Sequence, residues 1–85
     1  MNVLVEIDLP ERPTNEVAES MREAAGEFTG DSSNIRIAVP KSRRNMIAAR
    51  FKMKTTAQYK VVDNIADAFK DYVPDYEDIS ITFSK

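Results

Sequence analysis

Four segments of the chain alternate hydrophobic and polar residues with a period of two. This period is typical of a β-strand with one side in a core and the other in water. The segments span residues 2–9, 34–39, 47–54 and 79–84. The side chains expected to face the core are Val3, Val5, Ile7 and Leu9, then Ile35, Ile37 and Val39, then Ile47, Ala49, Phe51 and Met53, and finally Ile79, Ile81 and Phe83.

Two other segments carry apolar residues every three or four positions, the spacing of an amphipathic helix. The first is expected to begin near Thr14, whose hydroxyl can cap free backbone N–H groups, and to stop at Gly30. The second is expected to open with Thr55 and Gln58, which fit a capping box, and to end before Pro74. The expected buried stripes are Val17, Met21, Ala24 or Ala25, and Phe28 in the first helix, and Val62, Ile65, Phe69, and Tyr72 or Val73 in the second.

The expected elements follow the order β-α-β-β-α-β. With right-handed crossovers, this order gives the split βαβ, or ferredoxin-like, arrangement. We therefore expect an α+β fold with a four-stranded antiparallel sheet, strand order 4-1-3-2, and both helices on one face. A chain of 85 residues is long enough for one modest core. The sequence thus predicts a single ferredoxin-like domain over residues 1–85.

The composition argues against several classes of function. No apolar run approaches the roughly 20 residues of a membrane helix. The first residues lack the charged start and cleavage site of a secretion signal, so we expect a cytoplasmic protein without a membrane partner. The chain has no cysteine and no histidine, which removes thiolate chemistry and the commonest general base and metal ligand. We expect no enzymatic activity, no cofactor and no metal site.

The charges are strongly segregated along a chain whose formal net charge is only −2. Between Asp31 and Asp63 there is no acidic residue, whereas eight of the chain's 12 Lys and Arg residues lie there. These eight cations are Arg36, Lys41, Arg43, Arg44, Arg50, Lys52, Lys54 and Lys60. An asymmetry of this kind indicates a charged partner.

The candidate binding residues fall in two places of the expected fold. Residues 40–45 form a hairpin loop whose cations are Lys41, Arg43 and Arg44. This loop has no acidic partner nearby in sequence, and it is either a solvated turn or a contact for phosphate or carboxylate groups. The outward side of the strands carries Arg36, Arg50, Lys52 and Lys54. We expect Glu6 and Asp8, on the neighbouring central strand, to lie across from some of Arg50, Lys52 and Lys54 as weak cross-strand pairs.

Two functional hypotheses follow from these charges. In the first, the chain is a small binding module that presents the basic hairpin, residues 36–54, to nucleic acid. The phosphate contacts would be Lys41, Arg43, Arg44 and Lys54, with Arg36, Arg50 and Lys52 as flanking charge. The aromatic strand signature of RNA-binding domains is absent, so we do not expect bases to stack on the sheet.

In the second hypothesis, the chain is a protein–protein interaction module, such as an accessory subunit, an inhibitor or a homodimer. It would dock the basic hairpin on an acidic protein surface or pair the edge strand 34–39 with another chain. The uncompensated charge of the central segment favours nucleic acid. The acidic remainder of the chain favours a protein partner, because a net-negative molecule approaches a polyanion poorly.

Overall fold

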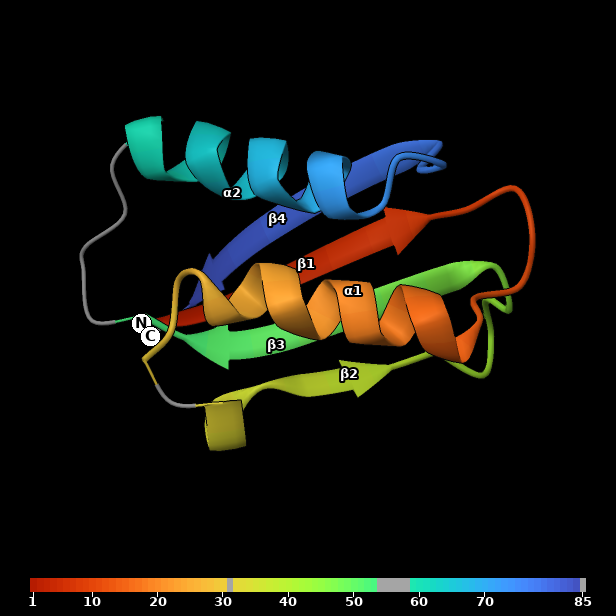
Figure 1. The fold of residues 1–85 in the computed structure, drawn as a ribbon, viewed down its shortest axis with the longest axis horizontal. Coiled ribbons are helices and arrows are strands. Elements are labelled where there is room, and N and C mark those ends of the chain that lie inside the picture. Colours follow the sequence, from red (N-terminus) through yellow and green to blue (C-terminus); the bar gives the residue numbers. More distant parts are fainter. Residues whose placement is uncertain (31, 54–58, 85) are drawn as a thin grey trace.

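The structure is a computed structural model that describes residues 1–30, 32–53 and 59–84. The elements along the chain are β1 (Asn2–Asp8), α1 (Asn15–Gly26), a short 3-10 helix (Ser32–Asn34), β2 (Arg36–Ala38), β3 (Met46–Lys52), α2 (Tyr59–Tyr72) and β4 (Asp78–Ser84), as drawn in Figure 1. Across the described ranges, no helix is long and apolar enough to cross a membrane.

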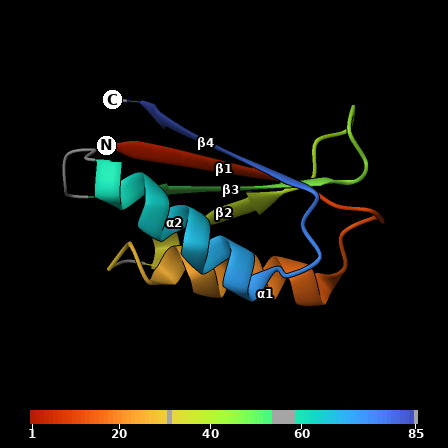
Figure 2. The ribbon, with the colours of Figure 1, turned by 90° about the horizontal axis from the view of Figure 1, so that it is seen from above.

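The four strands form one antiparallel sheet in the order β2-β3-β1-β4. Both helices lie on the same face of this sheet (Figures 1 and 2). Read from the opposite edge, the strand order is 4-1-3-2, so the predicted α+β class, the strand order and the helix placement are confirmed. We call the side of the sheet that faces away from the helices the open face.

The core lies between the sheet and the helices. Phe51 of β3 sits at its centre, because its ring centroid lies 6.4 Å from that of Phe28 and 6.3 Å from that of Phe69. These three stacked rings connect β3 to α2 and to the segment that follows α1. The alternation identified the core side correctly, since every expected inward residue of segments 2–9 and 47–54 is buried.

Helix α1 begins where the sequence predicts but ends earlier. The Thr14 hydroxyl accepts a hydrogen bond from the backbone N–H of Val17 at 3.3 Å and so caps the helix. The predicted stop at Gly30 is wrong, because the helix ends at Gly26. The N–H of Glu27 bonds to the carbonyl three residues earlier at 3.2 Å, which tightens the last turn. Neither glycine has a positive φ, so the left-handed glycine cap behind the prediction is not used.

Strand β2 is shorter than the predicted strand 34–39. Asn34 belongs to the 3-10 helix, and Val39 is 46% exposed rather than directed into the core. Pro40 has no N–H to donate to a strand ladder, which explains why the pairing with β3 stops before it. The edge of the sheet at β2 is therefore only three residues long.

Helix α2 packs on the sheet with a stripe that starts one residue before the predicted one. Val61 packs against the core, where the sequence predicts Val62, while Ile65, Phe69 and Val73 are buried as expected. A constant step of four residues from Val61 places all four side chains in one row along the helix. The predicted capping residues 55 and 58 lie outside the described residues.

Candidate functional site

Three cations lie together on the open face, toward one end of β2 and β3. The strand register places Arg36 of β2 directly opposite Arg50 of β3. Lys52 lies on the same side of β3, because side chains two residues apart in a strand share a face. All three side chains are exposed. We call Arg36, Arg50 and Lys52 the arginine patch.

The arginine patch borders a shallow hollow of about 270 Å³ in the open face. The register brings Leu4 of β1 beside Arg50, and it brings Asn2 beside Lys52. Ser84 of β4 lies on the other side of Asn2 and also lines the hollow. Asn2 and Ser84 were not predicted as site residues, because only the register of three strands places these polar groups beside the cations.

Carboxylates do not neutralise the arginine patch: in the described part of the chain, none of its three residues forms an ion pair. The prediction that Glu6 and Asp8 face these cations is wrong. They lie opposite the uncharged Ala48 and Met46. Arg50 is only diagonal to Glu6, which separates their Cα atoms by roughly 7–8 Å. The register is set by the buried side of the sheet, and the outward rows follow from it.

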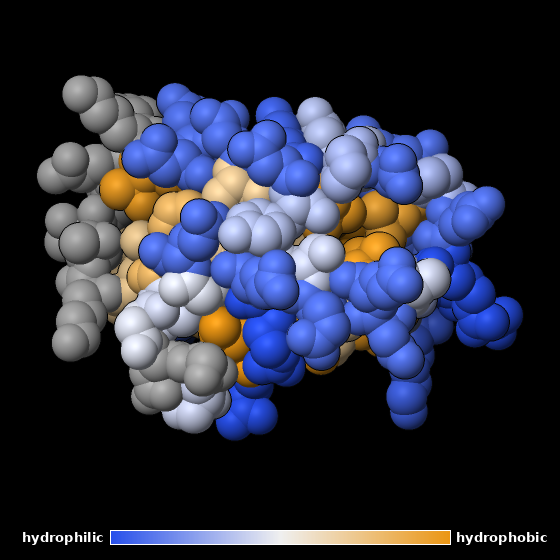
Figure 3. All heavy atoms as spheres, viewed as in Figure 1, coloured by the Kyte–Doolittle hydropathy of each residue, from blue (hydrophilic) through white to orange (hydrophobic). Residues whose placement is uncertain are grey.

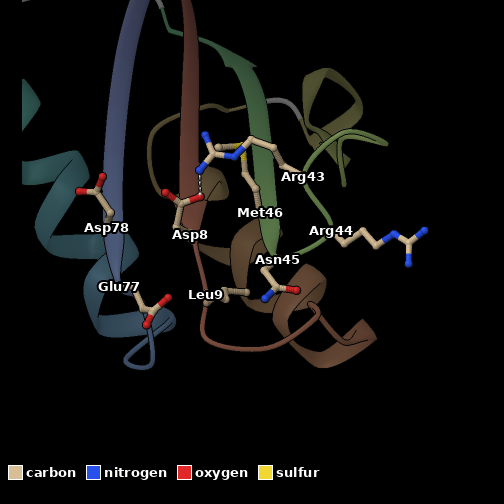
Figure 4. A pocket seen from close by; sticks show the side chains of 8 residues that line it. All are labelled: Asp8, Leu9, Arg43, Arg44, Asn45, Met46, Glu77 and Asp78. Atoms are coloured by element: carbon tan, nitrogen blue, oxygen red, sulfur yellow. Dashed lines mark hydrogen bonds and ion pairs between the residues drawn. The ribbon is translucent and has the colours of Figure 1, made fainter.

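The loop of residues 39–45 joins β2 to β3 and rises on the open-face side of the sheet, opposite the helices (Figure 2). Two consecutive turns shape it, closed by hydrogen bonds of 3.2 Å from the N–H of Arg43 to the Pro40 carbonyl and from the N–H of Met46 to the Arg43 carbonyl. The Arg43 side chain reaches past Met46 and donates to the Asp8 carboxylate at 2.8 Å (Figure 4). The loop has no acidic residue near it in sequence, but the fold gives Arg43 an acidic partner that lies 35 residues away.

The other two loop cations, Lys41 and Arg44, are exposed. Arg44 extends away from the ion pair into solvent (Figure 4). Arg50 lies four positions after Met46 in β3, so the arginine patch and the start of the loop lie about 13 Å apart along the strand. Lys54 lies outside the described residues. The predicted cations thus form two separate groups on the open-face side rather than one continuous surface.

The helices give the opposite side of the molecule a negative charge. The exposed carboxylates on the helices and at the end of α1 are Glu16, Glu19, Glu23, Glu27, Asp63, Asp67 and Asp71. The cations on these helices are Arg22, Lys60 and Lys70. Figure 3 views this side and shows mostly hydrophilic residues, with apolar ones visible between them. The charge segregation in the sequence therefore becomes a segregation between two faces of the fold.

The open face offers neither an aromatic platform nor a metal site among the residues that the structure describes. Phe28, Phe51 and Phe69 stack in the core, on the other side of the sheet. The strand positions that face outward are aliphatic, polar or charged. In the same ranges, no group of three or more acidic side chains is arranged to hold a metal ion.

No protein-family model matches the chain, and a search among curated proteins finds no relative. The function is therefore argued from the geometry of the open face. At the arginine patch, this face presents exposed cations that form no ion pair within the described ranges, beside amide and hydroxyl groups, an arrangement suited to binding an anion.

Proposed function

We propose that this chain is a small, non-enzymatic binding module with a ferredoxin-like fold, and that its open face binds the phosphate backbone of single-stranded nucleic acid. The observation that carries the proposal is the direct opposition of Arg36 and Arg50, with Lys52 beside them. Within the described ranges, none of these three residues forms an ion pair.

Like charges directly opposite each other destabilise a sheet, by roughly the 0.2–1 kcal/mol that opposite charges would contribute. A phosphate bound between Arg36 and Arg50 removes this repulsion and accepts charge-assisted hydrogen bonds from both guanidinium groups. The gain on binding therefore includes relief of an unfavourable interaction in the free protein. The same arrangement has no comparable benefit for a neutral ligand.

The proposed contacts are to the backbone rather than to the bases. Stacking platforms of single-strand-binding proteins are aromatic, whereas Leu4, Ala48 and Thr82 occupy the open face beside the cations. Binding is thus expected to tolerate many sequences and to depend on salt. Three phosphate contacts on a single strand correspond to a slope of about −2 for log K against log salt concentration.

The exposed loop cations Lys41 and Arg44 provide a second contact beyond Met46, the first residue of β3, which lies about 13 Å along the strand from Arg50. The strand would run from one group of cations to the other across the open face. The carboxylates of the helices favour this orientation, because they repel the same polyanion from the opposite side of the molecule.

The test is titration of a fluorescently labelled single-stranded oligonucleotide, followed by anisotropy, at 50 mM and 200 mM salt. Arg50→Ala is compared with Arg12→Ala, which removes an exposed arginine from the segment between β1 and α1. We expect Arg50→Ala to weaken binding and to reduce the salt slope, whereas Arg12→Ala changes both little. Undetectable binding at 50 mM salt, or an equal loss in both variants, would refute the proposal.

An acidic protein surface is the second candidate partner. It is favoured by the lack of aromatic side chains on the described open face, because a protein carboxylate needs cations but no stacking platform. Binding of a poly-glutamate peptide, with no binding of any oligonucleotide under the same conditions, would support this candidate over nucleic acid.

A further inference from the structure

Strand β4 (Asp78–Ser84) forms the long free edge of the sheet. It pairs with β1 along seven residues and with no other described strand. Edge strands are normally protected from pairing with other chains by lysine, proline, a bulge or short length. Residues 79–84 read Ile-Ser-Ile-Thr-Phe-Ser and contain neither charge nor proline. The opposite edge, β2, is three residues long and carries Arg36.

The hydrogen bonds of the sheet show which backbone groups of β4 face this free edge. Leu9 donates to the Asn45 carbonyl at 2.8 Å, and Met53 donates to the Met1 carbonyl at 2.9 Å. Odd-numbered residues of β1 therefore bond to β3, and even-numbered ones bond to β4, because bonding directions alternate along a strand. By the register, the partners of those even residues in β4 are Asp78, Ser80, Thr82 and Ser84.

The backbone groups of Ile79, Ile81 and Phe83 consequently point away from β1, toward solvent. The Ile79 N–H supports this assignment, since it donates to the carboxylate of Asp78 at 3.0 Å rather than to a neighbouring strand. The side chains of the three residues face the helix layer but are only partly buried. In the single chain, this edge therefore has backbone groups without a partner among the described strands and apolar side chains that are only partly buried.

We propose that β4 pairs in antiparallel fashion with β4 of a second copy of this chain, about a two-fold axis at Ile81. In this register Ile81 faces Ile81 of the second copy, and Ile79 faces Phe83. All the outward N–H and C=O groups of these three residues then find partners. The two sheets become one sheet, and the carboxylate of Asp78 gives up its bond to the Ile79 N–H and turns to solvent.

A second copy is the occupant that fits, because the strand is complementary to itself in this register. The three apolar residues of each copy form one continuous row on the helix side. On the open face, Ser80 faces Thr82, and Asp78 faces Ser84, so the single charge of the strand meets no like charge. Two β2 edges could not pair in this way over more than three residues.

The register is tested by disulfide trapping, which suits a chain without native cysteine. The variants Ser80→Cys and Thr82→Cys are exposed on the open face, and an equimolar mixture is oxidised. Residues 80 and 82 of opposite copies form a non-hydrogen-bonded pair, with Cβ atoms about 4.5–5.5 Å apart, close to the spacing of a disulfide. We expect disulfides that join one variant to the other to form a larger share of all disulfides than random pairing would give. A statistical mixture, or an excess of either like pair, would overturn the register.

Association itself is measured by sedimentation velocity across a concentration series. The double variant Ser80→Lys/Thr82→Lys opposes like charges twice in the dimer, and its matched control Ser80→Lys/Thr82→Glu opposes unlike charges. We expect the first to weaken dimerisation by about 2- to 30-fold and the control to preserve it. A chain that stays monomeric throughout, or equal behaviour of the two double variants, would overturn the proposal.

Discussion

Replacing Arg50 with threonine should stabilise the free protein while it weakens binding. Arg50→Thr removes the charge that opposes Arg36 and installs a residue that is favourable in strands. Relief of one directly opposed like-charge pair corresponds to about 0.2–1 kcal/mol in the free energy of unfolding. For a domain of this size, that is an increase in the melting temperature of about 1–8 °C.

The assay is urea unfolding followed by circular dichroism at low salt and at 1 M salt. Residues directly opposite in an antiparallel pair have Cβ atoms about 4.5–5.5 Å apart, which is within the screening length of about 8 Å at physiological ionic strength. At 1 M salt the screening length falls to about 3 Å. The stabilisation by Arg50→Thr should therefore shrink at high salt. The control Arg50→Lys keeps the charge and should bring no gain.

A double-mutant cycle with Arg36→Thr assigns the effect to this pair. Once Arg36 has been replaced, the replacement of Arg50 should no longer stabilise the protein, because the repulsion is already gone. A destabilised Arg50→Thr variant, with the same loss at both salt concentrations and in both backgrounds, would refute the reasoning. It would mean that the aliphatic part of Arg50 packs on the sheet and that its charge is incidental.

Two further substitutions test the core and the loop. Phe51→Ala should lower the free energy of unfolding by about 3–5 kcal/mol, because it removes the ring that stacks on Phe28 and Phe69. Urea denaturation measures this loss, and a near-neutral result would contradict the assignment of Phe51 to the core side of β3. Arg43→Ala should lower the free energy of unfolding by about 0.2–1 kcal/mol at low salt and by less at high salt, because the ion pair that it removes has side chains that are 58% and 30% exposed. Arg44→Ala should leave the free energy of unfolding unchanged in the same experiment, and equal effects of the two substitutions would argue against the pairing with the Asp8 carboxylate.

The architecture could be predicted from the sequence because the hydrophobic residues of the strands repeat with a period of two, which identifies the buried side of the sheet. Every expected inward residue of segments 2–9 and 47–54 is buried, and the element order led directly to the observed strand order. The local cap at Thr14 was also predictable, since it depends on residues three positions apart. These features follow from local patterns that each segment carries by itself.

The features that the sequence did not predict are mostly contacts between residues that lie far apart in the chain. Asp8 and Arg43 are 35 residues apart, and nothing near either residue in the sequence indicates their ion pair. The opposition of Arg36 and Arg50 depends on the register between β2 and β3, which is decided by how the buried residues fit together. The end of the strand at Val39 was predicted wrongly for a different reason. The alternation extends the strand to Val39, but the neighbouring proline cannot donate a hydrogen bond to the sheet, and the strand stops before it.

The carboxylates on the helices matter when many molecules of the protein are bound side by side on one strand. In the proposed complex, many molecules lie along one nucleic acid strand with their open faces inward, and the outer surface of this assembly carries the same sign of charge as the strand that it covers. A second layer of strand or protein meets repulsion at that surface, so coating should saturate at a single layer. The coated strands should stay dispersed instead of condensing, as polyanions do with uniformly cationic proteins.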